Sequence, residues 1–122
     1  MSQQLAVREQ YIEWLRRSVA QRRPLAEERL ARAWRVARRA ARLLREQYGV
    51  PRVRAFGSLL HPGRFHNSSD IDLAVEGLAV GDYWDALADV FLLDDEIAVD
   101  LVDPDTCPPD IWAVVEREGV DL

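Results

Sequence analysis

The sequence contains no lysine, because all sixteen of its basic residues are arginine. This absence excludes a P-loop lysine, a Schiff-base lysine and a serine–lysine dyad, since each of these chemistries needs a lysine amine. The single cysteine, Cys107, excludes an internal disulfide, which agrees with a reducing compartment. One cysteine and two histidines are also too few for a closed zinc site unless carboxylates complete it, so we do not expect zinc.

Long apolar runs are also missing. None approaches the roughly 20 residues that a membrane-spanning helix needs. The amino terminus carries Arg8 and Glu9 and lacks the apolar stretch and cleavage site of a secretory signal. With 122 residues, of which 48% are hydrophobic and 30% charged, the chain has the balance of one compact globular domain. We therefore expect a cytoplasmic protein with no membrane partner.

Charge is divided unevenly along the chain. Residues 1–54 hold fourteen arginines against five acids, whereas residues 55–122 hold two arginines against sixteen acids. The arginine-rich part could bind nucleic acid through its phosphates. A solvated helix face explains the same pattern more simply in a chain of net charge −5, so nucleic acid is the less favoured partner.

Apolar spacing predicts two helices in residues 1–48. The first has apolar residues at Leu5, Tyr11, Ile12, Leu15 and Val19. The second begins near Pro24 and ends before Gly49, with a seam at helical spacing formed by Leu30, Trp34, Ala37, Ala41, Leu44 and Tyr48. This seam can pack on the chain's own sheet or on a second copy, so a homo-oligomer remains open.

The spacing of apolar residues along the chain changes after residue 49. Short apolar runs predict strands at residues 53–56, 71–75 and 97–102. One helix is predicted at residues 83–91, with Asp82 as its N-cap, and another at residues 109–118. The sequence therefore predicts a two-helix extension, residues 1–48, followed by one compact α/β (α+β) unit, residues 49–122. Trp84 and Trp112 are interpreted as packing or interface residues.

Three acidic residues and a Gly-Ser pair stand at the predicted strands. Asp70 and Asp72 are two apart on a strand, so both carboxylates face one side, roughly 6–7 Å apart along the chain. Asp100 interrupts an apolar run, where a charge is costly unless it faces a cation, a partner or solvent. Three carboxylates suit Mg²⁺, and Gly57-Ser58 at a strand end offers N–H groups to a phosphate.

Each of these features alone has a simpler explanation. Asp-x-Asp is common in acidic surface strands, and a glycine after a strand needs no ligand. The segment is not an EF-hand loop, because Val75 stands where that loop requires glycine and Gly81 where it requires glutamate. The combination of all three features in order is what favours a metal and phosphate site.

The sequence at these positions resembles the minimal nucleotidyltransferases, small members of the DNA polymerase beta-like superfamily. The resemblance is carried by Gly57-Ser58, by Ser69-Asp70-Ile71-Asp72-Leu73 and by Asp100 within Val99-Asp100-Leu101-Val102. The end of the chain, residues 111–122, is similar as well, and the match covers about residues 46–122. The resemblance implies the nucleotidyltransferase fold, a small mixed sheet flanked by helices, with the amino-terminal helices as an extension outside the match.

The resemblance also implies roles for individual residues of this sequence. The resemblance implies that Asp70, Asp72 and Asp100 hold two magnesium ions and that Asp100 helps to deprotonate an attacking hydroxyl. It implies that Gly57 and Ser58 hold the triphosphate of ATP or another nucleoside triphosphate. The intervening loop departs from the family pattern, since residues 59–69 number eleven where the family usually has ten. Arg64 is the candidate replacement for the arginine that the family places soon after the serine.

Several functions follow from the resemblance. Such proteins often act as antitoxins of HEPN-type RNase toxins, some of them by adding AMP to a tyrosine of the toxin, and this is our leading expectation. The altered loop at residues 59–69 motivates an alternative, a degenerate binding module that neutralises its partner by contact alone. A small-molecule acceptor such as an aminoglycoside also remains open.

Overall fold

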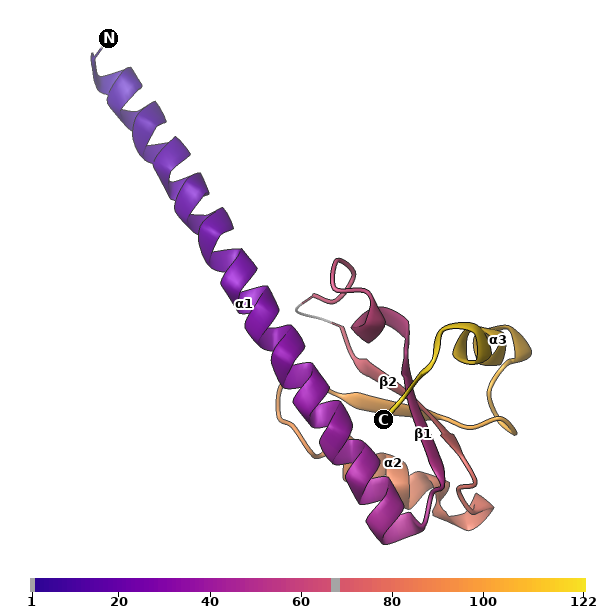
Figure 1. The fold of residues 1–122 in the computed structure, drawn as a ribbon. Helices are drawn as coiled ribbons and strands as arrows, with labels where there is room; N and C mark the ends of the chain where they lie inside the picture. Colours follow the sequence, from indigo (N-terminus) through magenta and orange to yellow (C-terminus); the bar gives the residue numbers. More distant parts are fainter. Residues whose placement is uncertain (1, 67–68) are drawn as a thin grey trace.

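The computed structural model of the chain describes residues 2–66 and 69–122, with the side chains of residues 2–7, 15 and 17–25 outside the description. A long helix comes first, and a small sheet with two further helices follows it (Figure 1). The elements are α1 (Ser2–Tyr48), β1 (Arg52–Phe56), β2 (Ile71–Glu76), α2 (Tyr83–Phe91), β3 (Val99–Val102), α3 (Pro109–Glu118) and β4 (Val120–Asp121). Two 3₁₀ helices, η1 (Gly57–Leu60) and η2 (Val80–Asp82), follow β1 and precede α2.

The four strands form one mixed sheet in the order β3-β2-β1-β4. β1 pairs antiparallel with both β2 and β4, while β2 and β3 are parallel. Parallel strands need a crossover connection, and α2 supplies it between β2 and β3. The predicted small mixed sheet flanked by helices is therefore confirmed, and β4 is a strand that the sequence pattern did not reveal.

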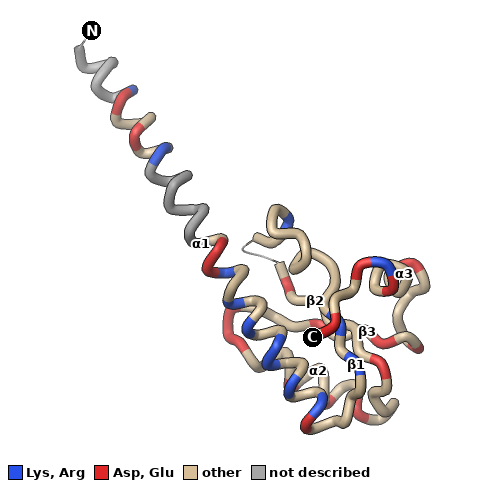
Figure 2. Tube along the Cα trace, viewed as in Figure 1, with Lys and Arg blue, Asp and Glu red and all other residues tan. Residues whose placement is uncertain are grey.

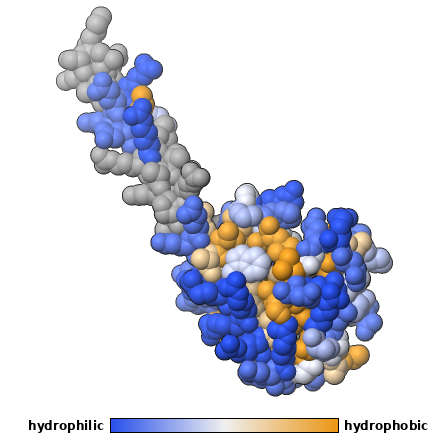
Figure 3. Space-filling view, viewed as in Figure 1, coloured by the Kyte–Doolittle hydropathy of each residue, from blue (hydrophilic) through white to orange (hydrophobic). Residues whose placement is uncertain are grey.

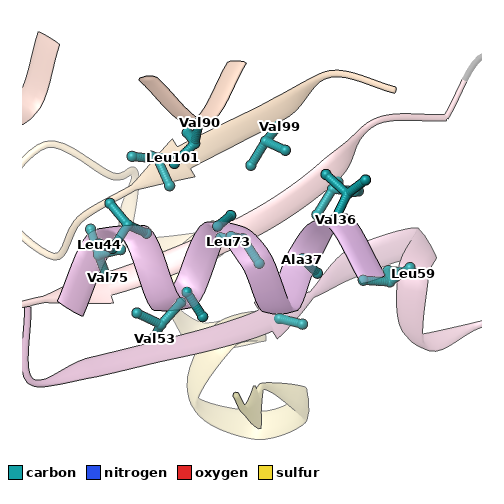
Figure 4. Packing of buried hydrophobic residues seen from close by; sticks show 14 of the residues in the cluster. Val36, Ala37, Leu44, Val53, Leu59, Leu73, Val75, Val90, Val99 and Leu101 are labelled. Carbon is teal, nitrogen blue, oxygen red and sulfur yellow. The ribbon is translucent and has the colours of Figure 1, made fainter. Parts of the chain in front are cut away.

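The two faces of the sheet are covered by different helices. Alternate residues of β2, beginning with Ile71 and Leu73, lie in the main core together with residues of α1 and α2 (Figure 4). Ala74 points to the other face, where it packs with Phe56 and with Val115 of α3. The charged residues Asp72 and Glu76 alternate with the core residues of β2, so they share the α3 face.

The predicted pair of amino-terminal helices is wrong, because α1 is one continuous helix through Pro24. A proline removes one backbone donor, whereas long runs of Ala, Arg, Leu, Glu and Gln on both sides favour the helix. Leu5, Leu15 and Val19, predicted to line the first helix, have side chains outside the described residues. No described helix is both long enough and apolar enough to cross a membrane.

The carboxyl-terminal part of α1 is built into the core. Ala37, Ala41 and Leu44 of the predicted seam are buried, and Leu30, Trp34 and Tyr48 pack at its border. Ala33, Val36 and Ala40 are buried as well, which widens the seam. The predicted extension is therefore corrected to a single helix that shares one core with the following unit, while its amino-terminal part projects from the domain (Figure 1).

Charge pairs fasten α1 to the loop before β3. Arg32 donates hydrogen bonds to Asp94, Asp95 and Glu96. Burial opposes ionisation of Asp94, but the bonds from Arg32 and from the backbone N–H groups of Glu96 and Ile97 outweigh it, so its pKa lies below the usual value. The contrast between basic α1 and the acidic remainder of the chain is visible in Figure 2.

The short helix η2 explains why one predicted cap is wrong. Asp82 stands at the N-cap position of α2 but makes no capping hydrogen bond with its side chain. A capping side chain needs an extended backbone, whereas Asp82 ends η2 and is itself helical, with φ −96° and ψ −8°.

Arg54 is a buried cation on the α3 face. Its side chain is 4% exposed and is ion-paired with Glu76 and, at 3.5 Å, with Glu116. Its guanidinium also lies over the Trp112 ring, 5.5 Å from the centroid. Arg54 therefore links the sheet to α3 through charge and ring contacts together.

Hydrophilic side chains of α1 and α3 border a patch of hydrophobic surface on the face shown in Figure 3.

We expect Arg54→Ala to lower the free energy of unfolding by about 3 kcal/mol, because it removes a buried cation together with its ion pairs to Glu76 and Glu116 and its contact with the Trp112 ring. Arg52 is the matched control, since it also pairs with Glu76 but its side chain is 47% exposed. Arg52→Ala should cost less than about 1 kcal/mol. Urea unfolding of both variants gives the comparison, and equal losses would contradict the assigned role of Arg54.

Candidate functional site

Strand pairing brings two of the three predicted carboxylates together. Asp72 of β2 lies opposite Asp100 of β3 in the parallel register and opposite Phe56 of β1 in the antiparallel register. Paired residues on adjacent strands point to the same side, so both carboxylates lie on the α3 face. Asp70, directly before β2, is exposed, as is Asp100, whereas Asp72 is half-buried.

Gly57 lies directly against the carboxylate of Asp72. Its φ is +76°, a conformation that favours glycine, and it follows the last residue of β1. A Cβ added to Gly57 would stand 2.9 Å from Asp72 Oδ2, closer than such atoms approach in proteins. The turn thus favours glycine here, and a Cβ at this position would displace the Asp72 carboxylate.

The surroundings of Asp72 oppose its negative charge. Burial raises its pKa, and the nearby charges of Asp100 and Asp70 raise it further, to about 6. The three carboxylates are therefore close enough to interact electrostatically. A divalent cation beside Asp72 would offset this repulsion, which is the chemistry expected of an acidic metal site.

Geometry alone does not complete a metal site. Across residues 2–66 and 69–122, no group of three His, Cys, Asp or Glu side chains is arranged to hold a metal ion as it stands. Asp72 is held by the sheet, while Asp70 and Asp100 are exposed, so their side chains have room to turn toward a cation. The oxygen donors thus fit a hard cation such as Mg²⁺ in chemistry, and its binding remains a proposal.

The loop after η1 is held in place by Ser69 and by α1. Ser69 is nearly buried; its hydroxyl accepts a bond from the His66 N–H at 3.0 Å and lies 3.4 Å from the Arg64 carbonyl. Arg29 of α1 donates to the His66 carbonyl and lies over the Phe65 ring. Sequence reasoning named Ser69 only as part of the Ser69-Asp70-Ile71-Asp72-Leu73 block, and its position three residues after His66 is the signal for this bond.

The remaining predicted nucleotide-binding residues lie at different depths. Ser58 is half-buried in η1, where its carbonyl accepts the His61 N–H at 3.0 Å. Arg64 is exposed in the loop, and in the described part of the chain its recorded bonds are made by its backbone. The structure therefore places Gly57 against the carboxylate of Asp72, with Ser58 next to it in the chain, and leaves the Arg64 side chain exposed.

A cavity of about 540 Å³ lies beside the carboxylates, between α2 and β3. Asp70 and Asp100 are at its border, and Trp84 and Leu92 supply part of its apolar wall. Sequence reasoning treated Trp84 as a packing or interface residue and did not place it near the acids. Only the crossover of α2 onto the β3 edge of the sheet brings them together.

We expect Gly57→Ala to destabilise the protein more than Gly49→Ala. Both glycines have positive φ, but Gly49 has open space around its Cβ position whereas Gly57 meets Asp72 Oδ2. Gly49→Ala should cost about 1 kcal/mol from backbone strain alone, and Gly57→Ala about 2–3 kcal/mol. Urea unfolding measures both, and equal losses would show that the close approach to Asp72 has no energetic weight.

We also expect Asp72→Asn to stabilise the metal-free protein near pH 7.5. The pKa of Asp72 is raised in the folded state, so folding binds a proton and the wild-type stability falls as pH rises from about 4 to about 6. After discounting for partial exposure, the gain is on the order of 1 kcal/mol at pH 7.5 and vanishes near pH 4. Thermal unfolding in a chelator measures it, with exposed Asp105→Asn as control; a gain independent of pH would contradict this assignment.

Comparison with known proteins was informative at the level of structure. No family model and no curated protein matches the chain. A chain of a toxin–antitoxin crystal structure with AMP-PNP is similar with a TM-score of 0.55 and 28% sequence identity, covering 66% of this chain and 67% of that chain. A putative nucleotidyltransferase from Sulfolobus solfataricus is similar in fold, with a TM-score of 0.52 and 18% identity, covering 79% and 84% of the two chains.

These similarities agree with the motifs and with the strand pairing. The mixed sheet, the Gly57 turn over Asp72 and the parallel register with Asp100 are present together. The chain therefore has a nucleotidyltransferase-like fold, which is the fold that the resemblance of its motifs implies.

Proposed function

We propose that the protein is a magnesium-dependent nucleotidyltransferase that transfers AMP from ATP to a side-chain hydroxyl of a partner protein. We further propose that this partner is a HEPN-type toxin, which the protein neutralises as its antitoxin. The observation that carries the proposal is the half-buried Asp72, with its carboxylate against the Gly57 turn and with Asp100 beside it across the strand pair. The likeness to a chain from a toxin–antitoxin crystal structure with AMP-PNP supports the nucleotide and the partner class.

The residues of the site take distinct roles in this proposal. Asp72 would hold the cation from a fixed position in the sheet, with Asp70 and Asp100 turning toward it. Gly57 and Ser58 begin η1, and in this proposal their N–H groups would donate to the triphosphate. Bound magnesium would supply neutralisation of the phosphate charge.

Asp100 is suited to receive a proton from the acceptor. One of its oxygens accepts the Leu101 N–H at 3.0 Å, and its carboxylate lies on the edge strand of the sheet. The exposed side of this carboxylate can face an acceptor hydroxyl. Asp100 is thus the proposed general base, while Arg64 would have to turn in from solvent to contact the triphosphate.

A contact-only antitoxin is the second candidate function. It is favoured by the altered loop at residues 59–69, in which the Arg64 side chain is exposed. In that case the acidic site is a remnant, and neutralisation depends on surface contact alone. Nucleic-acid binding by α1 is less favoured, because Arg32 is already engaged by the acids before β3.

The transfer is tested with magnesium and ATP labelled on the α-phosphate, added with purified protein to a lysate of its own host. We expect one labelled polypeptide, and we expect Asp70→Asn to lower the labelling by about 100-fold or more, because it removes a proposed cation ligand. Asp105→Asn, an exposed acid outside the site, is the matched control and should label as the wild type does.

The outcomes separate the candidates. Undiminished labelling by Asp70→Asn would overturn the enzymatic assignment. Absence of label with ATP binding intact points to another nucleotide or acceptor. Absence of both label and ATP binding, with the partner still neutralised by Asp70→Asn, supports the contact-only antitoxin.

A further inference from the structure

The cavity beside Asp100 is open and mainly apolar. Three large side chains of α2 and its carboxyl end are exposed to solvent there: Trp84 by 76%, Phe91 by 53% and Leu92 by 77%. Such side chains are rarely left exposed side by side unless they bind something. We call the surface formed by Trp84, Phe91, Leu92, Val99 and Asp100 the acceptor groove.

The acceptor groove lies on the far side of Asp100 from the proposed phosphate site. Gly57 follows β1, Asp72 lies on β2 and Asp100 on β3, in the order of the sheet. The lining of the groove comes from α2, β3 and the segments before β2 and β3, with no residue of η1. A triphosphate at Gly57 and a molecule in the groove would therefore approach the carboxylates from opposite sides.

The charges of the acceptor groove indicate which kind of molecule it would bind. Residues 65–116 contain fourteen acids and neither arginine nor lysine. Two of these acids, Asp70 and Asp100, stand at the groove itself. An apolar centre with two acids at its border and no basic residue in its lining is complementary to a molecule that carries apolar groups flanked by positive charges.

The edge of the sheet is partly closed to strand addition. The Leu101 carbonyl accepts the Tyr83 hydroxyl at 2.7 Å, and the Leu101 N–H donates to Asp100. Both backbone groups of Leu101 are thus engaged within the chain. An occupant is bound here mainly through its side chains, with Trp84 as the largest contact surface.

We propose that the acceptor groove binds the acceptor polypeptide through a segment of apolar residues flanked by basic ones, so that a hydroxyl of this segment reaches Asp100. This inference rests on the proposed function and adds the recognition of the acceptor to it. In the reaction, the hydroxyl oxygen forms a bond to the α-phosphorus of ATP, whose bond to the pyrophosphate oxygen breaks. The hydroxyl proton passes to Asp100, and pyrophosphate leaves with the bonding electron pair.

The test uses the full chain labelled with ¹⁵N and three probes in separate titrations. These are AMP-PNP with Mg²⁺, a capped basic peptide of sequence RLYLR and a capped acidic peptide of sequence ELYLE. The NMR signals followed are the Trp84 indole N–H, assigned with Trp84→Phe, and the Gly57 backbone N–H. We expect RLYLR to shift the Trp84 signal, with an affinity that falls as salt is raised, and ELYLE to leave it unchanged.

Variants test the groove without disturbing the core. Trp84→Ala and Leu92→Ser alter exposed side chains and should each weaken RLYLR binding by about fivefold or more, with AMP-PNP binding unchanged. Val80→Ser is the matched control, since Val80 is 89% exposed and lies outside the groove lining. It should bind both probes as the wild type does.

Each outcome bears on one proposal. A Trp84 shift caused by AMP-PNP and not by RLYLR would make the groove a nucleobase site and overturn the inference. Equal binding of RLYLR and ELYLE, or RLYLR binding unaffected by Trp84→Ala, would overturn it as well. If AMP-PNP leaves Gly57 unchanged while RLYLR shifts Trp84, the proposed nucleotide chemistry fails and the peptide-binding groove is supported.

Discussion

Pairing of β2 with its two neighbours is the constraint on which the rest of the structure depends. It places Ile71 and Leu73 in the main core, and the alternation of a strand then sends Asp72 to the opposite face. The parallel register with β3 sets Asp100 beside Asp72, while the antiparallel register with β1 leads directly into the Gly57 turn. The same hydrogen-bonded ladder therefore buries the apolar residues and gathers the acidic ones, and neither can change without the other.

Placing the carboxylates of Asp70, Asp72 and Asp100 near one another has an energetic cost. Asp72 is partly desolvated and faces two other carboxylates, so its pKa is raised to about 6. Other charges are compensated by ion pairs, as where Arg54 meets Glu76 and Arg32 meets Asp94. A site that disfavours its own charge until a cation arrives would suit the proposed metal-dependent transfer.

The helix α1 connects this site to the remainder of the molecule. Its small residues, Ala37 and Ala41 among them, allow close packing on the sheet, and Arg29 reaches the loop beside the carboxylates through His66. The β3 edge of the sheet is bordered by α2, whose exposed Trp84 and Leu92 flank Asp100. The carboxylates thus lie between a loop held by α1 and an apolar groove formed by α2, a placement suited to two substrates arriving separately.

The sequence by itself determined the strands β1, β2 and β3, the burial of Ala37, Ala41 and Leu44, and the spacing of Asp70 and Asp72 at the start of β2, because these depend on local period and on strand alternation. The sequence pattern also predicted that a second helix begins near Pro24, and this was wrong. The one backbone hydrogen bond that the proline removes is outweighed by the helix-forming residues on both sides of it. Tertiary structure alone decided that Gly57 touches Asp72, that Arg54 is buried between two acids and that Trp84 lies beside Asp100. These contacts join residues far apart in the chain, and their distances are set by strand order and helix crossover, which no local pattern encodes.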